Sequence, residues 1–300
     1  MAAAQQDLRP PQFLIDSFAN EAIQESDARL KSISTGSTLE QQSQYPVVVK
    51  IAAEIFNSET IDWNYELAAY LSRKSSGVGD VLRHVQNMRN QISNGEPVNC
   101  PLIAYYGTRR QWDKPDKQQA QQIQPLKFIP QMNGYVNSLA AVSFSLNLMR
   151  HWFSRMLLIS RKKTVPEFEA VRRAIADCYK NIDERSNLEK IQVDYDAETE
   201  DIEIQSYFRD GSIEFLPLHY LSDGAKSILA TVADIAYRMA TLNPHLREAV
   251  TTETAGVVLI DELDMHLHPS WQRKIIDSLR RTFPRLQFVF QCPEGKYSYS

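Results

Sequence analysis

The chain has 300 residues, of which 43% are hydrophobic and 23% are charged, and its formal net charge at pH 7 is −4. This composition is typical of a globular protein with a substantial core, and the length suffices for one large domain or two ordinary ones. The charge balance does not require a nucleic-acid partner. The first residues lack the pattern of a signal peptide, and no apolar run is long enough to predict a membrane span.

The three cysteines, Cys100, Cys178 and Cys292, are widely spaced and form no CxxC pair. Thiols in such a pattern are typical of the interior of a reduced protein rather than of a disulfide framework. We therefore expect packing cysteines in a cytoplasmic protein, with no membrane as a partner.

The first third of the chain predicts an irregular start followed by strand and helix. Residues 1–44 are rich in Ala, Gln and Ser and indicate an irregular or partly helical segment. Residues 45–56 are typical of a strand. Residues 80–92 place their apolar side chains on one helical face, with Asp80 as the expected N-cap. Residues 100–107 predict a short apolar strand.

The middle of the chain predicts a linker, two helices and a hairpin. Residues 113–125 have few apolar side chains and indicate the linker. A long helical pattern covers residues 136–160. A second helix over residues 164–180 opens with a capping box formed by residues 164 and 167. Residues 190–208 alternate on both sides of a polar turn, which predicts the hairpin.

Helices and strands alternate in the last third of the chain. LSDG, residues 221–224, precedes a strongly amphipathic helix, and GVVLI, residues 256–260, is typical of a buried parallel strand. Residues 270–283 predict another helix and residues 285–291 another buried strand. This order predicts an α/β fold with a parallel sheet.

The strand at residues 256–260 runs directly into two carboxylates, Asp261 and Glu262. Open α/β sheets bind ligands at the carboxyl ends of their strands. Asp261 is therefore placed to hold Mg²⁺, directly or through water, and Glu262 to orient or deprotonate an attacking water. That division of roles suits phosphoryl transfer. The alternative interpretation is a strand followed by surface acids.

LSDG has the composition of an anion-binding helix start. A serine and a glycine at the beginning of a helix present a hydroxyl, backbone N–H groups and the positive end of the helix dipole. Asp223 makes this start less attractive to phosphate than a second glycine would. A plain helix N-cap at Ser222 or Asp223 is the alternative.

Residues 216–244 and 256–290 together resemble the C-terminal lobe of an ABC-type ATPase. They are similar to the bacterial group described as predicted ATP-binding proteins involved in virulence. That group is similar to the PtuA ATPase of Septu anti-phage systems and, more distantly, to OLD-family and SMC-like ATPases. The resemblance covers most of residues 45–290, including residues 101–112. It implies an ABC/SMC-like P-loop NTPase fold with a helical subdomain.

The resemblance implies a role for each matching residue. Ser222, Asp223 and Gly224 would form the signature motif, which contacts the γ-phosphate of ATP held by the opposite subunit of a dimer. Asp261 would be the Walker B aspartate that binds Mg²⁺, and Glu262 would be the catalytic base.

The resemblance also implies roles for three residues that follow the acidic pair in the sequence. Asp264, His266 and His268 would lie in the D-loop region, near the nucleotide of the partner. The resemblance thus implies an ATP-hydrolysing subunit that acts as a dimer with ATP and Mg²⁺ as cofactors, and a link to anti-phage defence and a partner nuclease.

The resemblance also divides the chain into four segments. Residues 1–44 would precede the lobe, and residues 45–112 would be the remainder of an N-terminal nucleotide-binding lobe. Residues 113–189 would form the helical subdomain. Residues 190–300 would form the C-terminal ATPase lobe with the signature and Walker B motifs.

Two parts of the family pattern are missing from the sequence. The phosphate loop GxxxxGK[ST], whose amides, lysine and hydroxyl bind phosphates and Mg²⁺, is absent. Residues 291–300 contain no histidine where the family has one that senses the γ-phosphate. A fold that lacks the P-loop strand is expected to leave part of its core exposed.

Two other functions are therefore kept open. One is a catalytically incomplete fragment that serves dimerisation or partner binding. The other is a metal-dependent nuclease that uses Glu262, Asp264, His266 and His268 as metal ligands. Arg109 and Arg110 follow a strand end and could meet phosphate, and the basic helix face at residues 273–281 leaves nucleic-acid binding open.

Overall fold

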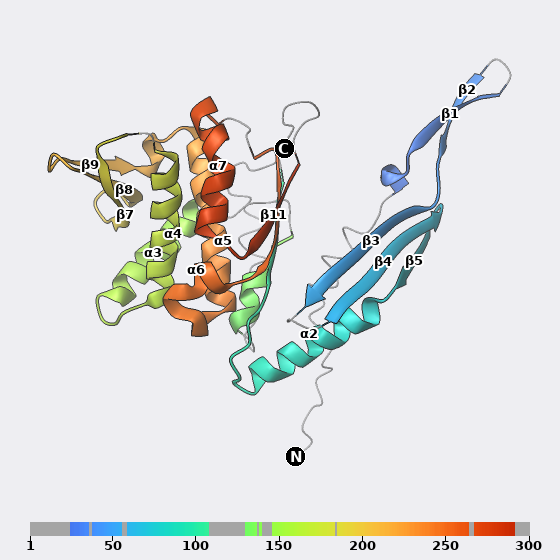
Figure 1. Cartoon of the computed structure of the whole chain (residues 1–300), viewed down its shortest axis with the longest axis horizontal. Coiled ribbons are helices and arrows are strands. Elements are labelled where there is room, and N and C mark those ends of the chain that lie inside the picture. Colours follow the sequence, from blue (N-terminus) through green and yellow to red (C-terminus); the bar gives the residue numbers. More distant parts are fainter. Residues whose placement is uncertain are drawn as a thin grey trace. The chain divides into compact units, whose positions relative to one another are not determined.

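The computed structural model describes residues 25–35, 38–55, 59–107, 130–136, 138–139, 146–183, 185–263 and 267–291. The chain divides into two compact units, Met1–Glu96 and Pro97–Ser300 (Figure 1). The boundary lies inside the predicted segment 45–112. The strand near the end of that segment, residues 102–106, pairs with a strand of the second unit, residues 256–260. The functional labels given to the four predicted segments stay predictions.

The first unit consists of antiparallel strands and one long helix. A short 3₁₀ helix, η1, is followed by a two-stranded sheet, a three-stranded sheet and a helix that packs against β4. The elements are η1 (Glu25–Asp27), β1 (Leu30–Thr35), β2 (Thr38–Ser43), β3 (Val47–Ile55), β4 (Glu59–Ala69), β5 (Ser72–Ser76) and α2 (Val78–Ser93). The strand predicted at residues 45–56 is confirmed.

Strands β1 and β2 pair as a hairpin, where the sequence predicts an irregular or partly helical segment. The prediction is wrong for residues 30–43 because their side chains are mostly polar. A strand of mostly polar residues shows no apolar alternation, and that alternation is the sign by which a sequence predicts a strand.

Helix α2 begins after Gly77 rather than at the predicted N-cap, Asp80. Gly77 has a φ of 75°, and a Cβ atom there would lie 2.1 Å from the carbonyl oxygen of Asp62 in β4. Only glycine fits a positive φ and such a close backbone approach. Asp80 instead lies in the first turn, where its carboxylate is 3.0 Å from Arg83.

The second unit contains a parallel sheet, as the sequence predicts, and the structure gives its strand order as β11-β10-β6. Its elements are β6 (Leu102–Tyr106), η2 (Pro130–Tyr135), α3 (Leu146–Ser160), α4 (Pro166–Ile182), β7 (Leu188–Asp196), β8 (Asp201–Phe208), β9 (Ile213–Pro217), η3 (Leu218–Tyr220), α5 (Asp223–Leu242), η4 (Pro244–Ala249), α6 (Val250–Glu253), β10 (Gly256–Asp261), α7 (Pro269–Thr282) and β11 (Leu286–Gln291). The predicted hairpin is confirmed as the antiparallel pair β7–β8, and β9 extends it.

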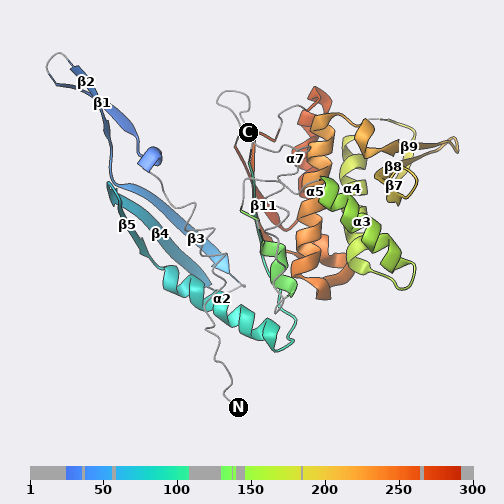
Figure 2. The ribbon, with the colours of Figure 1, turned by 180° about the vertical axis from the view of Figure 1, so that it is seen from behind.

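The layers of the second unit are visible from both sides (Figures 1 and 2). Helices α5 and α7 lie beside the parallel sheet, α3 and α4 lie beyond them, and the β7–β8–β9 sheet forms the far end. Helix α4 packs against α5, α7 and β7 and so joins these layers. No helix within the described ranges combines the length and apolar character needed to cross a membrane.

The two faces of the parallel sheet differ in exposure. The side chains that alternate toward the helices are buried: Leu102, Ala104, Tyr106, Val258 and Ile260. On the opposite face, the apolar side chains of Ile103, Leu259 and Val289 are exposed. The expectation that the missing P-loop strand leaves part of the core exposed stays a prediction.

Two helix starts differ from the sequence prediction. Helix α4 begins at Pro166 with Val165 as N-cap, and no side chain caps it. The predicted capping box is wrong because the residue before a proline is driven to an extended backbone, so that Val165 becomes the cap. The long helix predicted over residues 136–160 is described only from Leu146, after turns at residues 136 and 138–139. The predicted linker at residues 113–125 lies outside the described residues.

Cys100 and Cys178 are buried free thiols, which confirms the packing role predicted for them. Burial raises the pKa of each thiol to about 12, so both stay protonated at neutral pH. Cys292 lies outside the described residues.

Two glycines at the start of α2 test the importance of the close approach between α2 and β4. We expect Gly77→Ala to lower the free energy of unfolding by more than about 1 kcal/mol, because it forces strain at a positive φ. Gly79→Ala is the matched control, since a Cβ there meets nothing within 4 Å. It should stabilise the helix by about 0.4–1 kcal/mol. Urea unfolding of both variants measures the difference, and equal effects would contradict the assignment of Gly77.

Candidate functional site

Asp261 is the last residue of β10 and lies at the carboxyl end of the parallel sheet. The hydroxyl of Tyr105, on the neighbouring strand β6, donates a hydrogen bond to its Oδ2. Tyr105 pairs with Leu259, two residues before Asp261, so both side chains belong to the same face of the sheet. The structure therefore puts a half-buried carboxylate at the strand end where α/β sheets bind ligands.

The backbone turns sharply at Glu262. Its φ is 47°, and its N–H donates to the carbonyl of Gln291 at 3.0 Å. A non-glycine residue in this left-handed region stores about 1–3 kcal/mol of strain, and such residues cluster at functional sites. The turn ends the regular alternation of side chains along β10 at Glu262. Leu263 is buried immediately after it.

The histidine-containing segment is only partly described. Asp264 and His266 lie outside the described residues. His268 is the N-cap of α7, where its Nδ1 accepts a hydrogen bond from the N–H of Ser270 at 3.3 Å. This capping contact gives His268 a structural role at the start of α7. The role of His268 near a nucleotide stays a prediction. The described part of the chain holds no group of three or more His, Cys, Asp or Glu side chains that could bind a metal.

The predicted signature segment lies at the start of α5. Ser222 is the N-cap, and its Oγ accepts from the N–H of Ala225 at 3.3 Å. Ser222 and Asp223 are exposed, whereas Gly224 is buried. Lys226 places its Nζ 3.6 Å from the Asp223 carboxylate and so reduces the repulsion of an approaching anion. Ser222 is therefore the N-cap of α5, and the start of this helix is exposed to solvent.

A buried polar network fixes α5 against the sheet. Tyr106, the last residue of β6, donates its hydroxyl to Asp234 Oδ2 at 2.8 Å, and Arg238 Nε donates to the same oxygen at 2.8 Å. Arg238 Nη1 also donates to the carbonyls of Gly134 and Val136 at 2.8 and 2.9 Å. Burial raises the pKa of Tyr106 well above its usual range, which keeps the phenol a donor.

The end of α5 is fixed by Asn243. Its side chain accepts from Cys100 N at 2.7 Å and donates to Cys100 O at 2.9 Å and to Thr254 Oγ1 at 3.1 Å. These contacts join the helix end to the segments that lead into β6 and β10. This network and the Asp234–Arg238 pair were not predicted from the sequence, although two charged residues spaced i, i+4 within a buried helix are a detectable sign.

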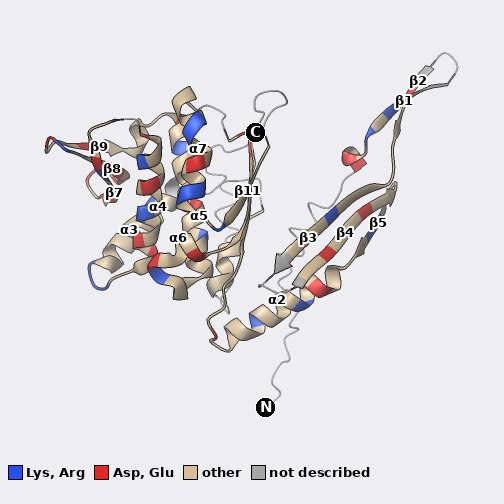
Figure 3. Ribbon diagram, viewed as in Figure 1, with Lys and Arg blue, Asp and Glu red and all other residues tan. Residues whose placement is uncertain are grey.

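Basic residues lie along α7 with an acidic residue among them (Figure 3). Arg273 and Lys274 are separated from Arg280 and Arg281 by Asp277. This mixed face gives no particular support to nucleic-acid binding, which stays a prediction. Arg109 and Arg110 lie outside the described residues.

The family model described as AAA domain, putative AbiEii toxin, Type IV TA system matches residues 108–290. The match extends over more than half of the chain and includes both the α5 start and the β10 end. The chain therefore belongs to this family of AAA-domain proteins.

Curated relatives agree with this assignment. The retron Ec83 probable ATPase of Escherichia coli is 52% identical over 69 residues, which are 23% of this chain and 12% of that protein. Septu protein PtuA of Bacillus mycoides is 32% identical over 123 residues, which are 41% of this chain and 15% of that protein. Septu protein PtuA of Bacillus thuringiensis is 30% identical over 143 residues, 47% of this chain and 34% of that protein. The predicted similarity to PtuA ATPases is confirmed, and the chain spans a minor part of each relative's length.

Solved structures show only a distant likeness. An Smc head bound to the C-winged helix domain of ScpA has a TM-score of 0.34 and 12% identity, covering 80% of this chain and 62% of that chain. An Smc head domain with a coiled coil derived from Pyrococcus yayanosii has a TM-score of 0.25 and 16% identity, covering 41% of this chain and 21% of that chain. Scores this low do not define the fold, which rests on the α/β arrangement and the family match.

The buried pair that holds α5 can be tested against an exposed pair of equal length. Asp234→Ala leaves the Arg238 guanidinium buried without its carboxylate, and we expect the free energy of unfolding to fall by about 3–5 kcal/mol. The control is Glu253→Ala, which breaks the exposed pair with Arg285, also at 2.8 Å. It should cost less than about 1 kcal/mol. Denaturant unfolding that gives both variants the same loss would contradict a special role for the buried pair.

Proposed function

We propose that this chain is part of an ABC-type ATPase that works as a dimer. In this proposal, the exposed segment Ser222, Asp223 and Gly224 contacts the γ-phosphate of ATP held by a second chain. Asp261 and Glu262 serve the Mg²⁺ and the attacking water. The observation that carries the proposal is the strained Asp261–Glu262 turn at the carboxyl end of β10, in a chain of an AAA-domain family.

The acidic pair suits the cofactors that the proposal names. Carboxylate oxygens are the ligands that Mg²⁺ prefers, and Asp261 presents one at the strand end. Bound Mg²⁺ would neutralise charge that develops on the phosphates. Glu262 leaves the strand direction at its left-handed backbone, which gives its carboxylate a position different from that of Asp261. We assign to Glu262 the role of orienting or deprotonating the attacking water.

The dimer follows from the motifs rather than from a contact between chains. In the ABC-type ATPases that residues 221–224 resemble, the signature segment contacts ATP held by the opposite subunit of a dimer. The relatives named Septu protein PtuA and retron probable ATPase support a role in anti-phage defence. A nuclease partner belongs to the same proposal.

The proposal is tested first by titrating the 300-residue chain with ATP in the presence and absence of Mg²⁺ in a calorimeter. We expect Mg²⁺-dependent binding, and turnover that Glu262→Gln reduces by about 10²–10⁴-fold, the usual contribution of a general base. Glu253→Gln is the control, because Glu253 lies outside the acidic pair and binds Arg285 on the surface.

Two results would contradict the proposal. The absence of any ATP binding would favour the catalytically incomplete fragment that serves dimerisation or partner binding. Cleavage of nucleic acid without ATP, abolished by His266→Ala, would favour the metal-dependent nuclease.

A further inference from the structure

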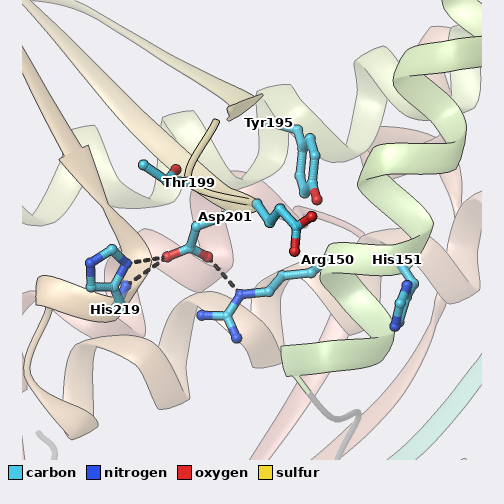
Figure 4. Close-up of a pocket in the computed structure, with 7 residues that line it drawn as sticks. Arg150, His151, Tyr195, Thr199, Asp201 and His219 are labelled. Atoms are coloured by element: carbon cyan, nitrogen blue, oxygen red, sulfur yellow. Dashed lines mark hydrogen bonds and ion pairs between the residues drawn. The ribbon is translucent and has the colours of Figure 1, made fainter. Parts of the chain in front are cut away.

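A buried carboxylate, Asp201, lies where three elements of the second unit meet (Figure 4). Its side chain is 3% exposed, and it begins β8 directly after the β7–β8 turn. Oδ1 accepts from Arg150 Nε in α3 at 2.7 Å and from its neighbour Ile202 N at 2.8 Å. Oδ2 faces His219 in η3, at 2.7 Å from the ring Nδ1 and 3.0 Å from the backbone N. Each carboxylate oxygen of Asp201 therefore has two hydrogen-bond partners.

This carboxylate is charged in the folded protein. Burial raises the pKa of Asp201, but the hydrogen bonds from Arg150 and His219 outweigh that effect and hold the pKa below its usual range. Because a carboxylate only accepts hydrogen bonds, the Nδ1 of His219 carries the proton in this contact. Charge-assisted hydrogen bonds of this kind are about twice as strong as neutral ones.

His219, which makes this contact, lies three residues before Ser222, the first residue of the proposed signature segment. Leu218 is buried, and the N–H of Leu221 donates to its carbonyl at 3.1 Å, so η3 is a short stiff turn. Leu221 alone separates this turn from the N-cap Ser222. The backbone and the ring of His219 are both held by Asp201. The direction in which Ser222 enters α5 therefore depends on this contact.

We propose that Asp201 is a positioning residue for the segment Ser222, Asp223 and Gly224, which it couples to α3 through Arg150. The proposal rests on the function proposed above. A pocket of about 410 Å³ opens beside the contact and is lined by Arg150, His219 and Asp201 together with Tyr195 and Glu200. His219 is 45% exposed there, so a molecule that binds in this pocket reaches the contact directly.

The hairpin offers a matched control for Asp201. Asp196 pairs directly with Asp201 across β7 and β8. Its carboxylate accepts from Glu198 N at 3.0 Å and from Thr199 Oγ1 at 2.7 Å, both within the same turn. Asp196→Asn therefore weakens the turn without touching η3. Asp201→Asn keeps the shape of the side chain and replaces one accepting oxygen by a donor that opposes Arg150 or His219.

Amide hydrogen exchange of the folded chain tests the proposal without nucleotide. We expect Asp201→Asn to accelerate exchange over residues 218–226 by about tenfold, the equivalent of one lost hydrogen bond. Exchange in the middle of α5 should stay unchanged. Asp196→Asn should accelerate exchange only in the β7–β8 turn. Equal patterns in the two variants, or a uniform acceleration over the whole unit, would overturn the proposal.

A second variant covers the case in which Asp201→Asn does not fold. His219→Phe keeps an aromatic ring and the backbone contact but removes the Nδ1 donor at a partly exposed site. Acceleration confined to residues 218–226 supports the proposal, and unchanged exchange there overturns it.

Nucleotide measurements separate this proposal from the proposed function. In a wild-type chain that hydrolyses ATP, Asp201→Asn should lower kcat about tenfold and change the KM for ATP by less than about twofold, as expected when alignment rather than binding is lost. Asp196→Asn should change neither. A wild-type chain that binds no ATP contradicts the proposed function, while the exchange pattern alone still decides whether Asp201 positions the segment.

Discussion

The buried hydrogen bonds that Asp234 and Arg238 make with the sheet strand β6 and with η2 hold helix α5 in place, and the rest of the second unit depends on that position. A charged pair without access to water must be satisfied from several sides. Tyr106 supplies a hydrogen bond from the sheet, and the carbonyls of Gly134 and Val136 accept from the arginine. The pair therefore joins three segments that are far apart in sequence. Apolar packing alone would allow the helix to slide, whereas these hydrogen bonds define one register.

The two ends of helix α5 have different surroundings. The C-terminal end is joined through Asn243 to the segments that lead into β6 and β10. The N-terminal end stays exposed at Ser222 and Asp223. A helix anchored firmly at one end and along its length can present its other end without fraying. That arrangement is what recognition of a ligand at a helix start requires.

The acidic pair at the end of β10 shows how a regular strand gives way to a strained turn. Within β10 successive side chains alternate between the two faces, so Asp261 shares the open face with Tyr105 and Leu259. The left-handed backbone of Glu262 breaks this alternation at once. The hydrogen bond from its N–H to Gln291 and the burial of Leu263 stabilise the strained turn. Strain maintained by neighbouring contacts in this manner is consistent with a site rather than with surface acids.

The sequence by itself determined the parallel α/β arrangement, the strand that ends at Asp261 and the helix start at Ser222, because each of these has a local pattern of apolar spacing and capping. Only the tertiary structure decided that α2 begins after Gly77 rather than after Asp80, and that β1 and β2 pair. It alone brought Arg150 and His219 to Asp201, and Tyr106 to Asp234. The physical reason is that the contacts of Asp201 and Asp234 join residues far apart in the chain, and that mostly polar strands such as β1 and β2 show no apolar periodicity.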